Sequence, residues 1–225
     1  MRLHILGDLH LEFGMAPIPA TDADVVVLPG DIHLGREGRR WARRHFQHKP
    51  VVYVLGNHEF YRRSLPGLTK TLKRETDGSR IHLLENCAVE INGYTFLGCT
   101  LWTDFQLALD PEAAMQAAEA IMSDYSLIQF GPKNRLLRAR DSARLHAESV
   151  AWLRSELAKC DRAHTIVVTH HAPSVCGTGG RQPCRVRHWR SVGNRLADVG
   201  WRVRTQRHAD PRARTDSTSA DRSDA

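Results

Sequence analysis

Four short segments of the sequence combine carboxylate, amide and imidazole side chains at spacings that suit the binding of metal ions. They are Asp8-Leu9-His10, Gly30-Asp31, Gly56-Asn57-His58-Glu59 and His170-His171. Each segment follows closely after a short apolar run that is typical of a buried strand. Because parallel strands bring their carboxyl ends to one edge of a sheet, we expect these side chains to meet in one crevice.

The residue types match what the hydrolysis of a phosphoester requires. Two divalent ions about 3.5–4 Å apart can share a bridging hydroxide as nucleophile and neutralise the charge on the phosphoryl oxygens. Asp31 suits the position of a carboxylate that spans both ions, because it directly follows a buried strand. Asp8 and His10 are two residues apart, so in an extended segment they would point to the same side. Asn57 offers a neutral oxygen ligand, and His58 is free to protonate the leaving group.

The elements that must position these residues follow from the hydrophobic pattern. Runs rich in Val, Ile and Leu predict strands at residues 2–6, 24–28, 50–55 and 164–169. Helices are predicted between them at residues 37–48 and 64–76, the second with Ser64 as its N-cap. This alternation of strands and helices predicts a parallel sheet with right-handed crossovers, and hence an α/β fold.

Residues 82–105 depart from this alternation. Residues 83–84, 87–91 and 94–97 are strand-like, and the last two of these segments flank Asn92-Gly93, a pair that favours a tight hairpin turn. The hairpin predicts a second, partly antiparallel sheet. Beyond it, Asp110-Pro111 is typical of a helix start, and a further helix is predicted from Asp141 with Leu145, Trp152, Leu153 and Leu157 on one face.

The net charge of +7 is concentrated near the C-terminus. Residues 1–176 hold 21 Lys and Arg against 20 Asp and Glu, a net of +1, whereas residues 177–225 hold 11 Arg and 5 Asp, a net of +6. The second part contains no Ile, Phe, Tyr, Met or Lys. We therefore predict one domain over residues 1–176 and an Arg-rich tail over residues 177–225, disordered from about residue 205.

The composition also bears on location and partners. No apolar run reaches the ~20 residues of a membrane span, so no membrane association is expected. The chain runs directly into the first motif, so no secretory signal is expected, and five cysteines without a C-x-x-C pair indicate reduced thiols and a cytoplasmic location.

The tail arginines could bind nucleic acid. Only Trp189 and Trp201 lie among them, so nucleic acid is not the expected partner. A helical run of arginines at residues 36–44 is interpreted as a solvated face.

The order and the strand-end placement of the four segments resemble the successive motifs of the calcineurin-like metallophosphoesterase superfamily over about residues 1–176. This resemblance implies a four-layer α/β/β/α sandwich that hydrolyses a small-molecule or nucleotide phosphoester, either a monoester or a diester. The implied cofactors are two divalent ions, Mn²⁺, Fe, Zn²⁺ or Co²⁺. Asp8 and His10 would hold the first ion, Asp31 would bridge both, Asn57 and His170 would hold the second, and His58 would be the proton donor.

The chain departs from that family at its C-terminal end. The Gly-His-x-His motif that completes both metals in the family is absent, and the only histidines after His171 are His188 and His208. We expect the sandwich to be incomplete there and hypothesise that the tail comes from an altered reading frame, a truncation or a degenerate paralogue. Two alternatives to an active hydrolase therefore stay open: a catalytically impaired relative, and a nucleic-acid-binding protein acting through its tail.

Overall fold

The structure, a computed structural model, describes residues 1–14 and 17–173. In chain order the elements are β1 (Leu3–Ile5), β2 (Val25–Pro29), α1 (Glu37–His45), β3 (Val51–Val54), the 3-10 helix η1 (His58–Phe60), β4 (Ser64–Leu65), α2 (Gly67–Thr76), β5 (Ile81–Leu84), β6 (Cys87–Ile91), β7 (Tyr94–Cys99), α3 (Pro111–Ile121), α4 (Asp124–Leu127), β8 (Gln129–Phe130), β9 (Arg135–Leu136), α5 (Ala139–Leu157), the 3-10 helix η2 (Arg162–His164) and β10 (Thr165–Thr169).

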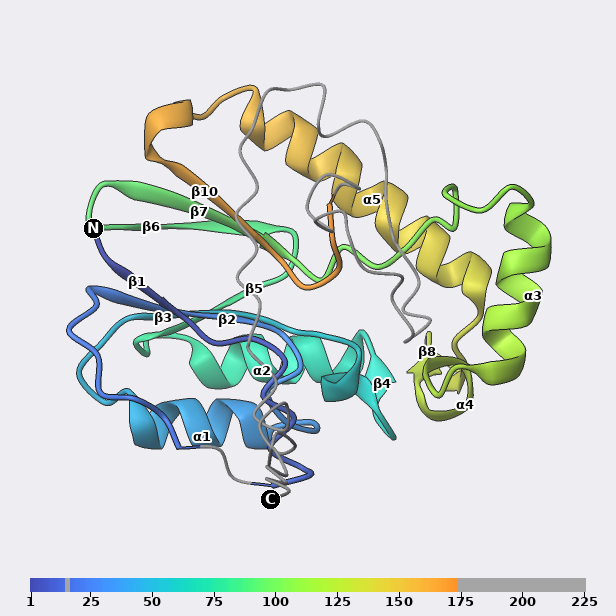
Figure 1. Cartoon of the computed structure of the whole chain (residues 1–225), viewed down its shortest axis with the longest axis horizontal. Helices are drawn as coiled ribbons and strands as arrows, with labels where there is room; N and C mark the ends of the chain where they lie inside the picture. Colours follow the sequence, from blue (N-terminus) through green and yellow to red (C-terminus); the bar gives the residue numbers. More distant parts are fainter. Residues whose placement is uncertain (15–16, 174–225) are drawn as a thin grey trace, which may run out of the picture.

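Two sheets form the middle of the molecule, and helices cover their outer faces (Figure 1). The first sheet has the order β1-β2-β3-β5 and is entirely parallel. The second has the order β10-β7-β6, with β10 parallel and β6 antiparallel to β7. Helices α1 and α2 lie on the first sheet and α5 on the second (Figure 1). The predicted α/β class and the four-layer α/β/β/α arrangement are confirmed.

The side chains of the strands alternate between two hydrophobic layers. In β2, Val25 and Val27 pack between the two sheets, whereas Val26 and Leu28 pack toward α1 and α2. Val52 and Val54 of β3 repeat the inward pattern. A third cluster, which includes Leu97, Cys99, Leu153 and Leu157, joins the second sheet to α5. β2 and β3 are thus buried on both faces, which explains their unbroken apolar sequence.

Several boundaries differ from the sequence prediction for tertiary reasons. Helix α2 begins at Gly67, so Ser64 is not its N-cap. Ser64 and Leu65 instead pair with Gln129 and Phe130 as β4 and β8, a contact between distant parts of the chain. β5 joins the first sheet and not the second. The predicted hairpin is confirmed, with Asn92 and Gly93 at φ values of 53° and 75°, as a tight turn between β6 and β7 requires.

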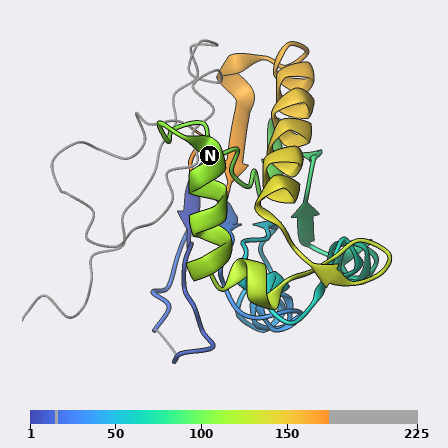
Figure 2. The same cartoon turned by 90° about the vertical axis from the view of Figure 1, so that its right-hand side faces the viewer.

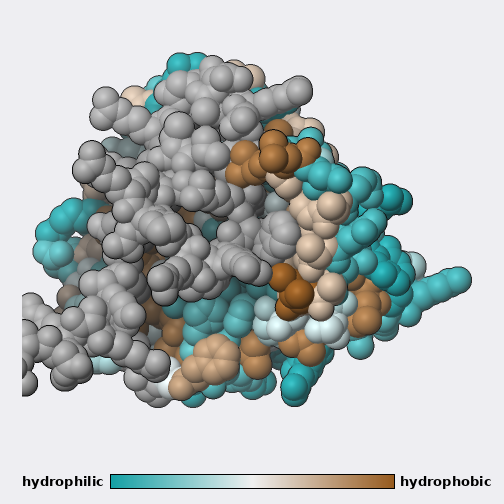
Figure 3. All heavy atoms as spheres, turned by 45° about the vertical axis from the view of Figure 1, so that its right-hand side comes forward, coloured by the Kyte–Doolittle hydropathy of each residue, from teal (hydrophilic) through white to brown (hydrophobic). Residues whose placement is uncertain are grey.

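Residues 106–138 form a cap segment that the sequence prediction anticipated only at α3. It contains α3, α4, β8 and β9, and it lies at one end of the sandwich, facing the viewer in Figure 2. Its large exposed apolar residues are Leu109, Ile121 and Leu136. Over the described residues visible in Figure 3, apolar side chains lie in small separate groups among polar ones. No helix in the described part of the chain is long and apolar enough to cross a membrane.

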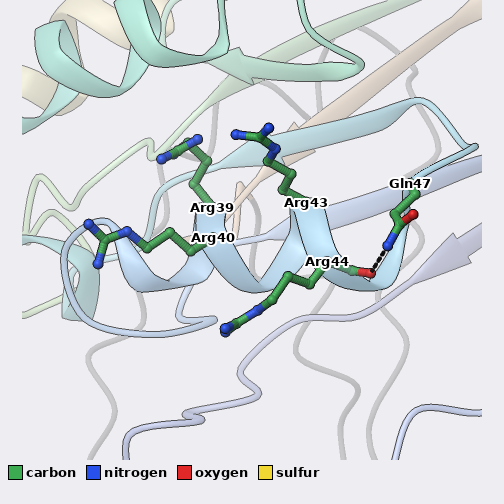
Figure 4. Close-up of a pocket in the computed structure, with 5 residues that line it drawn as sticks. All are labelled: Arg39, Arg40, Arg43, Arg44 and Gln47. Carbon is green, nitrogen blue, oxygen red and sulfur yellow. Dashed lines mark hydrogen bonds between the residues drawn. The ribbon is translucent and has the colours of Figure 1, made fainter.

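Arg40, Arg43 and Arg44 of α1 are exposed, and with Arg39 and Gln47 they line a shallow hollow (Figure 4). Three of the arginines in this region form ion pairs with nearby acids: Arg36 and Arg39 with Glu75 of α2, and Arg40 with Glu37. The pair of Arg40 with Glu37 is well exposed, as expected of a solvated face, whereas the side chains of Arg39 and Glu75 are mostly buried.

Candidate metal centre

The four predicted segments meet where β1, β2 and β3 end and where β10 ends in the second sheet. Asp31 follows β2, Asn57 follows β3, and His170 follows β10. The backbone holds these loops together: the Asp8 amide donates to the Gly30 carbonyl at 3.1 Å, and the His10 amide donates to the Asp31 carbonyl at 3.0 Å. One crevice therefore gathers residues that are distant in the sequence, as predicted.

Asp31 lies between two clusters of side chains that could hold metal ions. Its carboxylate belongs to one cluster with His10 and His58 and to another with Asp8 and His170; within each, potential ligand atoms lie within 4.8 Å of one another. The two carboxylate oxygens face different clusters, because Oδ2 lies 3.7 Å from His10 Nε2 and Oδ1 lies 3.6 Å from His170 Nε2. Asp31 is 5% exposed. A buried carboxylate in this position can contact two ions at once.

Asp8 and His10 do not lie in the extended segment that the sequence suggested. β1 ends at Ile5, and both residues adopt left-handed backbone conformations, with φ values of 52° and 45°. Their amides bond to the loop after β2, which turns the chain at each residue. As a result Asp8 groups with His170, whereas His10 groups with His58.

His170 is oriented by a hydrogen bond from the ring nitrogen that faces away from Asn57. His170 Nδ1 lies 3.0 Å from the Pro29 carbonyl, which leaves Nε2 directed into the crevice. There it lies 3.1 Å from Asn57 Oδ1. A histidine fixed through Nδ1 to a carbonyl is the usual arrangement of a metal ligand that binds through Nε2.

The charges in the crevice favour a cation at this point. Burial lowers the pKa of His170, but the carboxylates of Asp31, Asp8 and Glu59 outweigh burial and raise that pKa above its ordinary value. A nitrogen ligand, a neutral amide oxygen and carboxylates together suit Mn²⁺, Fe²⁺ or Zn²⁺. The residues present therefore fit a divalent metal centre.

Two glycines allow the loops to approach this closely. A Cβ at Gly30, whose φ is 91°, would collide with the His170 ring. A Cβ at Gly56 would collide with the Asp31 carboxylate. Both glycines therefore allow the close approach of the candidate ligands His170 and Asp31.

Comparison with known proteins agrees with the resemblance seen in the sequence motifs. A sequence model of the calcineurin-like phosphoesterases matches residues 1–194. The chain belongs to this family. It is 26% identical, over 214 residues, to an uncharacterized protein of Acanthamoeba polyphaga mimivirus, an alignment that covers 82% of this chain and 74% of that protein. Its fold is similar to that of the phosphopantetheinyl hydrolase of Mycobacterium tuberculosis, with a TM-score of 0.60 and 18% identity over 85% of this chain and 75% of the hydrolase.

The family match extends beyond residue 176, where we predicted the domain to end. Residues after 173 lie outside the described part of the chain, as do His188 and His208. The domain boundary at 176 and the origin of the tail therefore stay predictions.

Glu59, the last residue of the third segment, holds the loops that carry the ligands. It is fully buried and accepts four hydrogen bonds of 2.7–3.0 Å, from the amides of Asp31, Ile32 and Gly56 and from the Tyr53 hydroxyl. Burial and the nearby Asp31 carboxylate raise its pKa. Glu59 thus fixes the loop after β2 to the loop after β3.

Replacing Glu59 by glutamine is expected to lower the free energy of unfolding by about 2–6 kcal/mol. The amide group of glutamine would face two of the four donors and leave them without an acceptor, at about 1–3 kcal/mol each. Urea denaturation measures this change. Glu85→Gln is the matched control, because within the described part of the chain only Oε2 of Glu85 accepts hydrogen bonds, both from Thr100. Equal stability losses in the two variants would contradict the role of Glu59.

Glu12 is a site residue that the sequence analysis missed. Its Oε1 lies 2.8 Å from His58 Nδ1 and 3.4 Å from His10 Nδ1, so it orients both rings with Nε2 toward Asp31. Burial raises its pKa, but hydrogen bonds from His58 and His10 outweigh burial and lower it overall. The sequence did offer one signal for Glu12, which is its place two residues after His10 in the first motif.

Replacing Glu12 by alanine is expected to weaken Mn²⁺ binding by about 10- to 100-fold, the usual effect of losing a partner that orients a metal ligand. Isothermal titration calorimetry measures the affinity. Glu37→Ala, at a half-exposed acid on α1 away from the centre, is the control. Unchanged affinity in the Glu12 variant would mean that the two rings need no carboxylate to orient them.

His171 belongs to neither ligand cluster among the described residues. Its Nδ1 lies 3.1 Å from the Thr100 carbonyl, and its ring stacks on Trp102. Burial and the neighbouring charge of His170 lower its pKa to about 3, so it is neutral. Its position is that of a packing residue beside the centre.

Proposed function

We propose that the protein hydrolyses a phosphomonoester or phosphodiester with two divalent metal ions. Asp8, His10, Asp31, Asn57 and His170 are the proposed ligands, and Asp31 is shared by both ions. The observation that carries this proposal is the Asp31 carboxylate, whose two oxygens face two different clusters of ligand atoms. When bound, the ions activate a water molecule and neutralise charge on the phosphoryl group.

The side chains of the protein would hold the ions and supply the proton for the leaving group. Asp8 and His170 would hold an ion on one side of Asp31, and His10 would hold an ion on the other. His58 gives a proton from Nε2 to the leaving oxygen, while Glu12 keeps its Nδ1 occupied. The His58 amide donates to Asp31 Oδ1 at 2.9 Å, which fixes the shared carboxylate relative to the proton donor.

The substrate class follows from the family only at a coarse level, as a phosphoester. The structurally similar phosphopantetheinyl hydrolase makes a phosphopantetheine ester one reasonable substrate to include in a screen, although its 18% identity supports the fold alone. Nucleotide phosphoesters belong in the same screen. The proposed location is the cytoplasm.

The decisive experiment is an assay of the full-length protein against bis(p-nitrophenyl) phosphate with added Mn²⁺, compared with a sample treated with a chelator. We expect hydrolysis that depends on Mn²⁺. Such activity would mean that the centre works without the Gly-His-x-His motif. A folded sample without activity on any phosphoester of the screen would favour the catalytically impaired relative.

A further inference from the structure

The cap segment contributes a buried carboxylate to the metal centre. Asp124, at the start of α4, is 4% exposed. Its Oδ1 accepts hydrogen bonds from Asn57 Nδ2 and from the Tyr61 hydroxyl, both at 2.8 Å. The Asn57 Nδ2 also lies 3.2 Å from the Tyr61 oxygen. Asp124 thus contacts a proposed ligand from a part of the chain that the four motifs do not include.

The backbone fixes where Asp124 lies relative to Asn57. The Arg62 amide donates to the Leu127 carbonyl at 2.8 Å, and the Gln129 amide donates to the Arg63 carbonyl at 2.9 Å. Ser64 and Leu65 then pair with Gln129 and Phe130. The loop that leaves the third motif is therefore bound along its length to the segment that carries Asp124.

An asparagine side chain can bind a metal ion only through its oxygen. Its amide has two ends of nearly equal shape, and the hydrogen-bond partners decide which end faces the centre. A carboxylate oxygen accepts hydrogen bonds, so Asp124 selects the NH₂ end of Asn57. The opposite end, Oδ1, then points to His170 Nε2 and the crevice.

We propose that Asp124 is a positioning residue of the metal centre, which holds Asn57 with its oxygen toward the ion and thereby makes the cap segment part of the site. This inference rests on the proposed function, because it takes Asn57 as a ligand. The residue acts through Asn57 and does not itself contact metal or substrate. Removing the Asp124 carboxylate should therefore weaken metal binding through Asn57 and leave the other proposed ligands in place.

Tyr61 provides a matched control on the same hydrogen-bond cluster. It shares the Asp124 oxygen, and its ring lies against His58 with centroids 4.3 Å apart. A phenylalanine at this position keeps the ring and removes only the hydroxyl. Because the bond from Asn57 to Asp124 remains in Tyr61→Phe, this variant should keep most of its metal affinity.

The test is a double-mutant cycle on Mn²⁺ affinity, measured by titration calorimetry with the full-length protein. Asp124→Asn is expected to weaken binding by about 10- to 100-fold, because its amide can donate as well as accept and no longer selects one end of Asn57. Asn57→Ala should weaken binding at least as much. In the Asn57→Ala background, Asp124→Asn should have no further effect, since it acts only through Asn57.

The outcomes separate this inference from the proposed function. Wild-type affinity in Asp124→Asn, or an equal loss with and without Asn57, would overturn the positioning role and leave the hydrolase intact. Unchanged affinity in Asn57→Ala would overturn the ligand assignment itself. Circular dichroism without metal checks folding, and Asp124→Ser, with the same expected loss, replaces Asp124→Asn if that variant does not fold.

Discussion

Replacing Asp31 by asparagine is expected to abolish metal-dependent hydrolysis, with a loss of at least about 100-fold. Losing a partner that only orients a ligand already lowers metal affinity or activity by about 10- to 100-fold. Among the described residues, Asp31 is the one carboxylate that belongs to both ligand clusters. Asparagine keeps the shape and an oxygen that can accept from the His58 amide, so the loop should stay in place. Activity assays and Mn²⁺ titration measure the two losses together.

The control for Asp31 is an aspartate that lies away from the centre. Asp77 is exposed at the end of α2, and Asp77→Asn should keep the activity and metal affinity of the unsubstituted protein. Retained metal-dependent turnover in Asp31→Asn would mean that the two ions, or a single ion, are held without this carboxylate. The bridging assignment would then be wrong.

Replacing His58 by alanine is expected to slow the turnover of a substrate with an alkyl leaving group by about 10²- to 10⁴-fold, the usual contribution of a general acid. An alkoxide is a poor leaving group and needs the proton, whereas a p-nitrophenolate does not. The loss should therefore be much smaller with p-nitrophenyl esters. Parallel rate measurements on one alkyl and one aryl phosphodiester test this difference.

The position of His58 beside His10 and Asp31 makes a metal titration essential in the same experiment. A proton donor can be removed with little loss of Mn²⁺ affinity. If His58→Ala loses metal and hydrolyses both esters equally slowly, His58 is a ligand and the proton comes from another group.

Much of the fold was predictable because the pattern of each element is local. β2 and β3 lie between two hydrophobic layers, so each is an unbroken apolar run that is visible in the sequence. The Asn92-Gly93 turn fixes the hairpin by its own backbone preference. The start of α2 was not predictable, because Ser64 and Leu65 are held as a strand by a partner more than sixty residues away.

The candidate site likewise has features that the sequence predicts and features that depend on tertiary structure. The motif residues that come together in the crevice were recognisable from their types and their places after strands. The division of Asp8 and His10 between two clusters was not, because it depends on left-handed turns set by the neighbouring loop. Nothing in the sequence links Asp124 to Asn57, since only the docking of the cap segment brings them together.

The hydrogen bond between His170 and the Pro29 carbonyl has a consequence for folding. His170 directly follows β10 of the second sheet and Pro29 ends β2 of the first, so this proposed ligand is in place only when the two sheets have packed against each other. A chain in which they separate would lose part of the proposed metal-binding set. If the proposed centre binds metal, metal in solution would therefore stabilise the packed arrangement by mass action. The supply of metal would then determine how long the protein resists proteolysis, in addition to whether it can hydrolyse its substrate.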